Sequence, residues 1–273
     1  MGGTKIIGIM LVRNEDRFIG HAIRNILEFC DEIIVADNGS RDRTLDVVGE
    51  LAEKNPCISV APVAHPRQSQ ELIERYAGTD TWVFGVDGDE LYDPSGLRTM
   101  KEQLIEGAFD DVWCIYGNVL NCVSIDVRKG IAKGYLAPPS RSMTKLYNFS
   151  LVESWTDCPE RLHSGTLRFR PGMDEPRRLH LYKSVKWEAS SFRCLHAVFM
   201  HRSSLDKTRM KASRLNPAEI QAIRSAYDRK SYVTFMLRHL RSRLGTDWKH
   251  RKYRRGPLVI KQTDSFFNAE RKP

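Results

Sequence analysis

Three carboxylates follow a strand-forming run in "VFGVDGDELY" (83–92), namely Asp87, Asp89 and Glu90. Carboxylates so close together repel one another, and burying them costs free energy unless a positive charge lies among them. Two aspartates around one small residue can supply oxygen ligands to a hard divalent cation such as Mg²⁺ or Mn²⁺. Gly88 would let a substrate approach the backbone closely. The motif predicts a metal site, and an ordinary acidic turn is the alternative.

Two further polar loops also follow strand-like runs, "VRNED" (12–16) and "DNGSRDRT" (37–44). The side chains of the first loop have polar ends that can reach a base and a ribose. In the second loop, a carboxylate can accept hydrogen bonds from a ribose or base. The residues concerned are Arg13, Asn14, Glu15 and Asp37. Three such loops together are far more specific than any one of them.

Alternating strand and helix patterns must position these loops. Fully buried β-branched runs are predicted at 5–11 and 32–36, and two more strands at 57–63 and 81–87. Helical periods lie between them at 16–29, 40–54 and 67–77. This alternation predicts right-handed βαβ crossovers, a mostly parallel sheet, and ligands at the carboxyl ends of its strands. Ser40 is expected to cap the helix over 40–54, with Leu45 on its buried face. The glycine-rich motifs of dinucleotide and P-loop sites are absent from the sequence.

The second half has weaker patterns. Residues 111–120 predict one strand and 142–149 another, and a helical period runs from Pro217 to about Gly245. The rest of the tail has no clear period. The six cysteines contain no C-x-x-C pair, which favours reduced thiols over a zinc or redox site.

The positive charge belongs to the C-terminal segment. The chain has 273 residues and a formal net charge of +9, but from Arg224 onward there are 14 Lys/Arg against 4 Asp/Glu. That segment therefore carries +10, and the residues before it carry −1. In "WKHRKYRRG" (248–256) basic residues alternate with Trp248 and Tyr253, which predicts binding to an anionic membrane surface. Nucleic acid binding and a solvated face are the alternatives.

Apolar runs are too short for a membrane helix, and charge appears too early in the chain for a signal peptide. We therefore expect a cytoplasmic protein, held peripherally at the inner face of the membrane by its basic segment. No nucleic acid partner is expected.

The motifs "MLVRNE", "DNGSRDRT" and "DGDE" stand in the order and spacing of a known family. They resemble the GT-A glycosyltransferases of family 2, which carry (M/V)-x-x-(R/K)-N-E, then D-(N/D)-G-S-x-D-x-T, then D-x-D-E. The resemblance is strong over about the first 95 residues. It implies an α/β, Rossmann-like GT-A domain over 1–215, with a nucleotide-sugar-binding half (1–95) and an acceptor half (96–215). Residues 216–273 would form a helical basic extension.

This resemblance implies inverting, metal-dependent transfer of a sugar from a nucleotide-diphosphate donor, with a UDP-sugar favoured and Mn²⁺ or Mg²⁺ as cofactor. The acceptor would be a hydroxyl of a glycan, an envelope polysaccharide or a lipid-linked molecule. The donor-binding residues carried over are Val12, Arg13, Asn14, Glu15, Asp37, Asn38, Arg67, Gln70, Asp87 and Gly88. The family often has Arg-Asn where this chain has Gln70-Glu71, so Arg67 is expected to hold the diphosphate instead.

For the metal, the resemblance implies Asp89 as the direct ligand, with Asp87 near the metal and ribose and Glu90 orienting them. His196 is expected as a further ligand, with His201 as the alternative, and Arg202 and Lys207 are candidate phosphate contacts.

Inverting transfer needs a general base for the acceptor hydroxyl. The stretch "SWTDCPERLHSG" (154–165) offers Glu160 first, in the family's E-R context, and Asp157 second. Trp155 could stack on a sugar face. A surface ion pair between Glu160 and an arginine is the alternative.

Two other classes stay open. A nucleotidyltransferase would share such a sheet, but it usually has a glycine-rich loop and a lysine after the first strand, which "LVRNED" lacks. A non-catalytic relative that binds membrane or RNA is the other, although the intact D-G-D and DNGS motifs argue against it.

Overall fold

The computed structural model describes residues 3–140, 145–173, 176–206 and 252–270. The helix expected over 217–245 lies outside the described residues, as do Lys207 and Trp248. The expected domain boundary at 215/216 also falls outside them.

The main element is a seven-stranded sheet in the order β12-β6-β9-β4-β1-β2-β3. Its strands are β1 (Lys5–Val12), β2 (Glu32–Asp37), β3 (Ile58–Pro62), β4 (Thr81–Val86), β6 (Val112–Tyr116), β9 (Lys145–Asn148) and β12 (Arg177–His180). The first four are parallel, and only β9 runs against its neighbours β4 and β6. The predicted fold class, α/β with a mostly parallel sheet flanked by helices, is confirmed.

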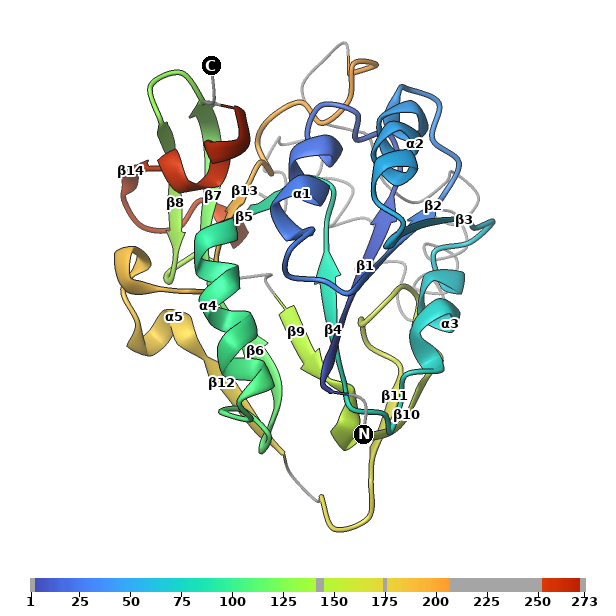
Figure 1. Cartoon of the computed structure of the whole chain (residues 1–273). Helices are drawn as coiled ribbons and strands as arrows, with labels where there is room; N and C mark the ends of the chain where they lie inside the picture. Colours follow the sequence, from blue (N-terminus) through green and yellow to red (C-terminus); the bar gives the residue numbers. More distant parts are fainter. Residues whose placement is uncertain (1–2, 141–144, 174–175, 207–251, 271–273) are drawn as a thin grey trace, which may run out of the picture.

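Each face of this sheet has its own core, and Figure 1 shows how the helices are arranged around the sheet. Helices α1 (Ile19–Ile26), α2 (Thr44–Lys54) and α4 (Pro94–Ile105) contribute to one core, while α3 (Gln68–Glu74) and the hairpin of β10 (Val152–Thr156) and β11 (Thr166–Phe169) contribute to the other. Strand β1 serves both, since its alternate side chains point to opposite faces. Ile6 and Met10 pack in the first core, and Ile7 and Ile9 pack in the second.

Two local expectations for α2 are wrong. The helix begins at Thr44, and its N-cap position is Arg43, without a side-chain cap. Ser40 instead accepts a hydrogen bond from the backbone N–H of Asn14, because the loop before the helix packs on the neighbouring strand end. Leu45 is 41% exposed, so it does not face the core.

A second, five-stranded sheet has the order β14-β8-β7-β13-β5. Its strands are β5 (Glu90–Tyr92), β7 (Asn118–Asp126), β8 (Ile131–Ala137), β13 (Arg193–His196) and β14 (Leu258–Gln262). The remaining elements are the helix α5 (Leu181–Ser184) and 3₁₀ turns at Phe149–Leu151, Trp187–Ala189 and Asp264–Glu270.

The single strand predicted over 111–120 is in fact two strands, β6 and β7, which belong to different sheets. The break lies at Gly117, where a Cβ atom would stand 2.2 Å from the carbonyl oxygen of Phe192. Only glycine permits this close approach of two backbones, so the chain changes sheets there.

The C-terminal tail joins the same body as the rest of the chain. Strand β14 pairs with β8, and Phe266 and Phe267 pack in the first core. This part of the expected helical extension is therefore a strand and a 3₁₀ turn. Tyr253 is buried with its ring edge-on to His196, and not exposed to a membrane as its place in the basic stretch suggested.

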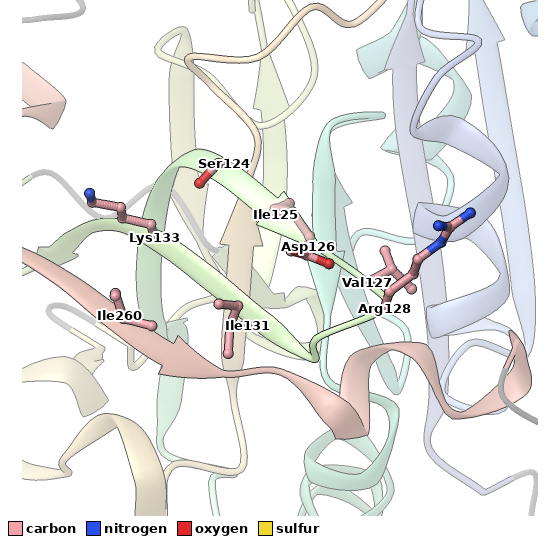
Figure 2. A pocket seen from close by; sticks show the side chains of 8 residues that line it. All are labelled: Ser124, Ile125, Asp126, Val127, Arg128, Ile131, Lys133 and Ile260. Carbon is pink, nitrogen blue, oxygen red and sulfur yellow. The ribbon is translucent and has the colours of Figure 1, made fainter.

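A cavity of about 540 Å³ lies on the five-stranded sheet at the β7–β8 turn (Figure 2). Ile125, Ile131 and Ile260 line it with the basic side chains of Arg128 and Lys133. None of the residues expected to act in catalysis contributes to it. Among the described residues, no helix has the length and apolar character needed to cross a membrane.

The packing of the first core can be tested by substituting Phe84. It is fully buried, and its ring contacts those of Phe29, Tyr92 and Phe192 at centroid distances of 5.3, 4.6 and 5.6 Å. Phe84→Ala should lower the free energy of unfolding by about 3–5 kcal/mol, because it leaves a cavity. Ile260→Ala, at a side chain 60% exposed, is the control and should change it by less than about 0.5 kcal/mol. Urea denaturation measures both, and equal midpoints would contradict this packing.

Candidate active site

The three polar loops meet at the carboxyl edge of the seven-stranded sheet, as predicted. Val12 at the end of β1 lies opposite Asp37 at the end of β2, and Met10 lies opposite Val86 at the end of β4. Parallel strands in this register place residues 12–16, 37–44 and 87–89 next to one another. The order of strands and helices in the sequence thus predicted correctly that these three loops lie together.

Hydrogen bonds join the first two loops. Asn14 has a left-handed backbone (φ 54°), which asparagine tolerates, and its Oδ1 accepts from the backbone N–H of Arg41 at 2.7 Å. The carboxylate of Asp37 accepts from the N–H groups of Gly39 and Ser40 at 3.1 and 3.2 Å. Asp37 and Asn38 are both buried. These contacts fix the backbone around the predicted nucleoside contacts.

Glu15 has a different position from the one expected. It is fully buried, and its Oε1 accepts from Nη1 of Arg202 at 3.0 Å. A Cβ atom at position 88 would lie 1.9 Å from Glu15 Oε2. Gly88 therefore makes room for the Glu15 carboxylate rather than for a substrate, and Glu15 is placed to support the D-G-D turn rather than to touch a nucleoside.

Asp87 is paired with a cation that sequence reasoning missed. The Arg161 guanidinium forms an ion pair with the Asp87 carboxylate, and its side chain is only 5% exposed. The same guanidinium donates to the carbonyl oxygens of Ile9 (3.1 Å) and Val86 (2.9 Å). Arg161 thus joins the ends of β1 and β4 and supplies the first counter-charge for the acidic turn. An arginine following Glu160 was the only sequence signal.

Asp89 lies between a histidine and an arginine. It is 2% exposed, and its Oδ2 is 3.9 Å from Nε2 of His196 and 3.9 Å from Nε of Arg202. Of the two histidines considered, His196 is therefore the one beside the D-G-D turn. Glu90 accepts from the Asp87 N–H (3.1 Å) and the Tyr92 hydroxyl (3.2 Å), so it orients the turn.

The donor chemistry of this pair suits a divalent cation. Across the described ranges no three His, Cys, Asp or Glu side chains gather into a ready metal site. The chain offers two donors, a carboxylate oxygen of Asp89 in the turn before β5 and an imidazole nitrogen of His196 at the end of the adjacent strand β13. An ion held there would need its other ligands from substrate oxygens and water, as Mg²⁺ commonly does.

The segment that carries the expected base is tied down by Gln70. This side chain is 1% exposed; its Nε2 donates to the carbonyl of Trp155 and its Oε1 accepts from the N–H of Leu162, both at 2.8 Å. Its amide therefore holds the chain and does not face a diphosphate. Arg67 is exposed just before α3. Trp155 is 5% exposed with its Nε1–H donating to Ser164 (2.8 Å), so it is a core residue and not a sugar-stacking one.

Backbone strain also marks this segment. Asp157, Leu162 and Ser164 have φ values of 57°, 54° and 57°, a conformation that costs side-chain-bearing residues free energy. Glu160 is half-buried and directly precedes Arg161, whereas Asp157 is exposed beside the hydroxyls of Thr156 and Thr166. Burial of the neighbouring Cys158 raises its thiol pKa to about 11, so this cysteine stays protonated near neutral pH.

Lys145 is a second cation that sequence reasoning missed. It begins β9 opposite Gly85, next to the end of β4. Burial lowers the pKa of Lys145, while the nearby carboxylates of Asp87, Glu90 and Glu160 act in the opposite direction. Glu160 therefore shares the electrostatic environment of the acidic turn.

A third segment, around Ser203, closes onto the first two loops. Ser203 Oγ donates to Asp42 at 2.6 Å, and the N–H of Ser204 donates to Asp16 at 2.8 Å. Burial alone would raise the pKa of Asp42, but hydrogen bonds from Ser203 and Thr44 outweigh it and hold that pKa below its ordinary value. These bonds position the neighbouring Arg202.

The model of glycosyl transferase family 2 matches residues 9–158. The chain belongs to this family. The matched range contains all three polar loops of this family 2 chain but ends before Glu160 and Arg161.

Curated relatives of this family 2 chain include uncharacterized glycosyltransferases of Rickettsia prowazekii (strain Madrid E) and Rickettsia conorii (strain ATCC VR-613 / Malish 7). They are 23% and 22% identical over 186 residues, 68% of this chain. The chain spans 60% and 62% of the length of these two relatives.

Solved structures similar to this family 2 chain include two named transferases. One is the mannosyltransferase PcManGT from Pyrobaculum calidifontis in complex with GDP-Man and Mn²⁺, at 15% identity and a TM-score of 0.43 over 92% of this chain and 83% of that one. The other is glucosyl-3-phosphoglycerate synthase from Mycobacterium tuberculosis with phosphoglyceric acid, at 18% identity and a TM-score of 0.37 over 55% and 58% of the two chains.

Arg161 can be tested by a double-mutant cycle. Arg161→Met should destabilise the fold by about 3–5 kcal/mol, because it leaves the Asp87 carboxylate without its buried cation. Adding Asp87→Asn should recover part of that loss, measured by urea denaturation. Arg177→Met, which breaks an exposed pair with Asp111, is the control and should change little. Strictly additive effects of the Arg161 and Asp87 changes would show that the pair is not coupled.

Proposed function

We propose that this family 2 chain is an inverting, metal-dependent glycosyltransferase that moves a sugar from a nucleotide-diphosphate donor, favoured to be a UDP-sugar, to an acceptor hydroxyl. The observation that carries the proposal is the position of Asp89 and His196, a hard-cation donor pair, at the sheet edge where the polar loops of β1 and β2 also end. A sugar diphosphate needs a cation and a nucleoside site side by side, and this edge offers both.

The nucleoside end rests on the loops after β1 and β2. The contacts described above hold the residues proposed to line this end, which are Val12, Asn14, Asp37 and Asn38. Arg13 adds a positive charge to this end. Its Nη1 is buried and makes no hydrogen bond within the part of the chain that the structure describes. A guanidinium in that setting suits a diphosphate or ribose oxygen.

At the other end, Asp89 and His196 would hold Mn²⁺ or Mg²⁺. A bound ion neutralises the charge that develops on the departing diphosphate. Arg161 keeps Asp87 in place, and Glu90 holds the turn, so that Asp89 presents its carboxylate toward His196. The protein thus arranges its own ligands before the donor arrives.

Glu160 is the proposed general base, which accepts the proton of the acceptor hydroxyl as its oxygen attacks the anomeric carbon opposite the diphosphate. That direction of attack inverts the anomeric configuration. Support comes from its place one residue before Arg161, whose anchor on Asp87 ties Glu160 to the acidic turn. Asp157 is the second candidate, more exposed and bonded to threonine hydroxyls.

For the acceptor, an aromatic pair lies farther along the same edge. Tyr116 ends β6 and lies opposite His180 at the end of β12, with their rings stacked at 4.7 Å and 5°. Both are half-exposed, and Lys145 lies on β9 between them and β4. We infer that this pair takes the sugar-stacking role that Trp155 cannot fill. A glycan, envelope polysaccharide or lipid-linked sugar would suit it.

The metal role predicts a specific loss. Asp89→Asn should abolish Mn²⁺-dependent transfer or donor hydrolysis, and with it the thermal stabilisation by UDP-sugar plus Mn²⁺, while the unliganded melting temperature stays similar. GDP- and dTDP-sugars in the same thermal-shift screen identify the base. Asp46→Asn, at a carboxylate 68% exposed, is the control. Full activity of the Asp89 variant, or of the wild type in excess EDTA, would remove the metal from the proposal.

The base is tested separately. Glu160→Gln should lower turnover about 10²–10⁴-fold with donor affinity little changed, because it removes only proton transfer. Asp157→Asn is the matched variant from the same segment, and steady-state kinetics measure both. A larger loss in the Asp157 variant would move the base to that residue.

A further inference from the structure

Asn121 lies directly beside His196 in the five-stranded sheet. Strands β7 and β13 are parallel, with Asn121 opposite His196, and β5 on the other side places Glu90 opposite the same histidine. Asn121 is fully buried. A buried amide must satisfy its hydrogen-bonding groups within the protein, so its partners determine which way it faces.

The orientation of that amide follows from its other partners. Nδ2 of Asn121 donates to the hydroxyl of Ser140 at 2.9 Å and to the carbonyl oxygen of Tyr135 at 3.4 Å. A carbonyl oxygen only accepts, so the NH₂ group must face it. The Ser140 hydroxyl donates onward to the Leu136 carbonyl at 2.7 Å, which leaves its oxygen to accept from Asn121. Oδ1 of Asn121 therefore faces His196.

This orientation selects one form of the neutral imidazole. Oδ1 of Asn121 is 3.0 Å from Nδ1 of His196, so Nδ1 carries the hydrogen and donates it. The lone pair is then on Nε2, the atom that faces the Asp89 carboxylate at 3.9 Å. Tyr253 packs its ring edge-on against the imidazole at 5.5 Å and limits its rotation. Nε2 of His196 and Oδ2 of Asp89, which also lies 3.9 Å from Nε of Arg202, could then act as ligands of one cation.

We propose that Asn121 is a positioning residue that fixes the tautomer and direction of His196 for the divalent cation. The inference rests on the proposed function, because it concerns the same metal pair. Groups that hydrogen-bond to the second nitrogen of a metal-ligating histidine commonly raise metal affinity by about 10–100-fold.

The experiment uses the full chain and Mn²⁺ itself, with free Mn²⁺ measured by electron paramagnetic resonance. Asn121→Leu, which has a similar shape and no acceptor, should weaken Mn²⁺ binding by about 10–100-fold. Asn121→Asp keeps an oxygen at Nδ1 but loses the donor to the Tyr135 carbonyl, so it should bind Mn²⁺ more tightly than Asn121→Leu. Ser140→Ala is the matched control, because it disturbs the same buried cluster without removing the acceptor, and it should bind Mn²⁺ normally.

A spectroscopic measurement separates positioning from stability. Long-range ¹H–¹⁵N spectra of the metal-free wild type at alkaline pH, assigned with a His196→Gln variant, should show His196 with its hydrogen on Nδ1. A hydrogen on Nε2 would overturn the inference even if Asn121→Leu fails to fold. Equal Mn²⁺ affinity of folded Asn121→Leu and wild type would also overturn it. If the wild type itself binds no Mn²⁺ with or without UDP-sugar, the proposed function fails instead.

Discussion

The fold depends on how three buried carboxylates and one partly exposed carboxylate are neutralised at one sheet edge. Glu15, Asp89 and Glu90 are at most 2% exposed, and Asp87 follows β4 beside them. Charges at that depth cost several kcal/mol each unless a cation or donor meets them. Arg161 and Arg202 supply those cations within the chain, and backbone and hydroxyl donors meet Glu90.

Both arginines come from late in the chain, and this has a structural consequence. The edge built by β1, β2 and β4 is complete only when the segments around Arg161 and Arg202 have closed over it. Gln70 and Ser69 hold the first segment, through the N–H groups of Leu162 and Arg161, and Asp42 holds the second through Ser203. Because Arg161 directly follows Glu160, its ion pair with Asp87 also holds Glu160 near this edge. The contacts that neutralise the carboxylates are therefore also contacts that assemble the candidate site.

The sequence predicted what depends on local pattern. Strands β1, β2 and β4 are almost entirely buried apolar runs, whereas β3 at the edge of the sheet is largely exposed. The order of strands and helices alone brought the loops after β1, β2 and β4 together. Contacts between distant residues could not be predicted this way. An arginine that pairs with a buried aspartate has no periodic signal, so Arg161 was considered only as a neighbour of Glu160. The side chains of Trp155 and Gln70 could in principle bind ligands. Their polar groups are instead hydrogen-bonded to other residues of the fold. Gly117 ends a strand only because Phe192 lies against it.

The D-G-D spacing gains a physical meaning from the two sheets. The chain leaves the seven-stranded sheet at Val86 and enters the five-stranded sheet at Glu90. Asp87 directly follows β4 of the first sheet, where Arg161 holds it, and Asp89 directly precedes β5 of the second, where it lies beside His196. The residue between them lies against Glu15 and has no room for a side chain. The two aspartates thus stand on either side of Gly88 in the turn that joins the two sheets. The contact with Glu15 requires a residue without a side chain between them. The proposed metal ligand at Asp89 and the anchor of Asp87 on Arg161 are therefore two parts of one junction.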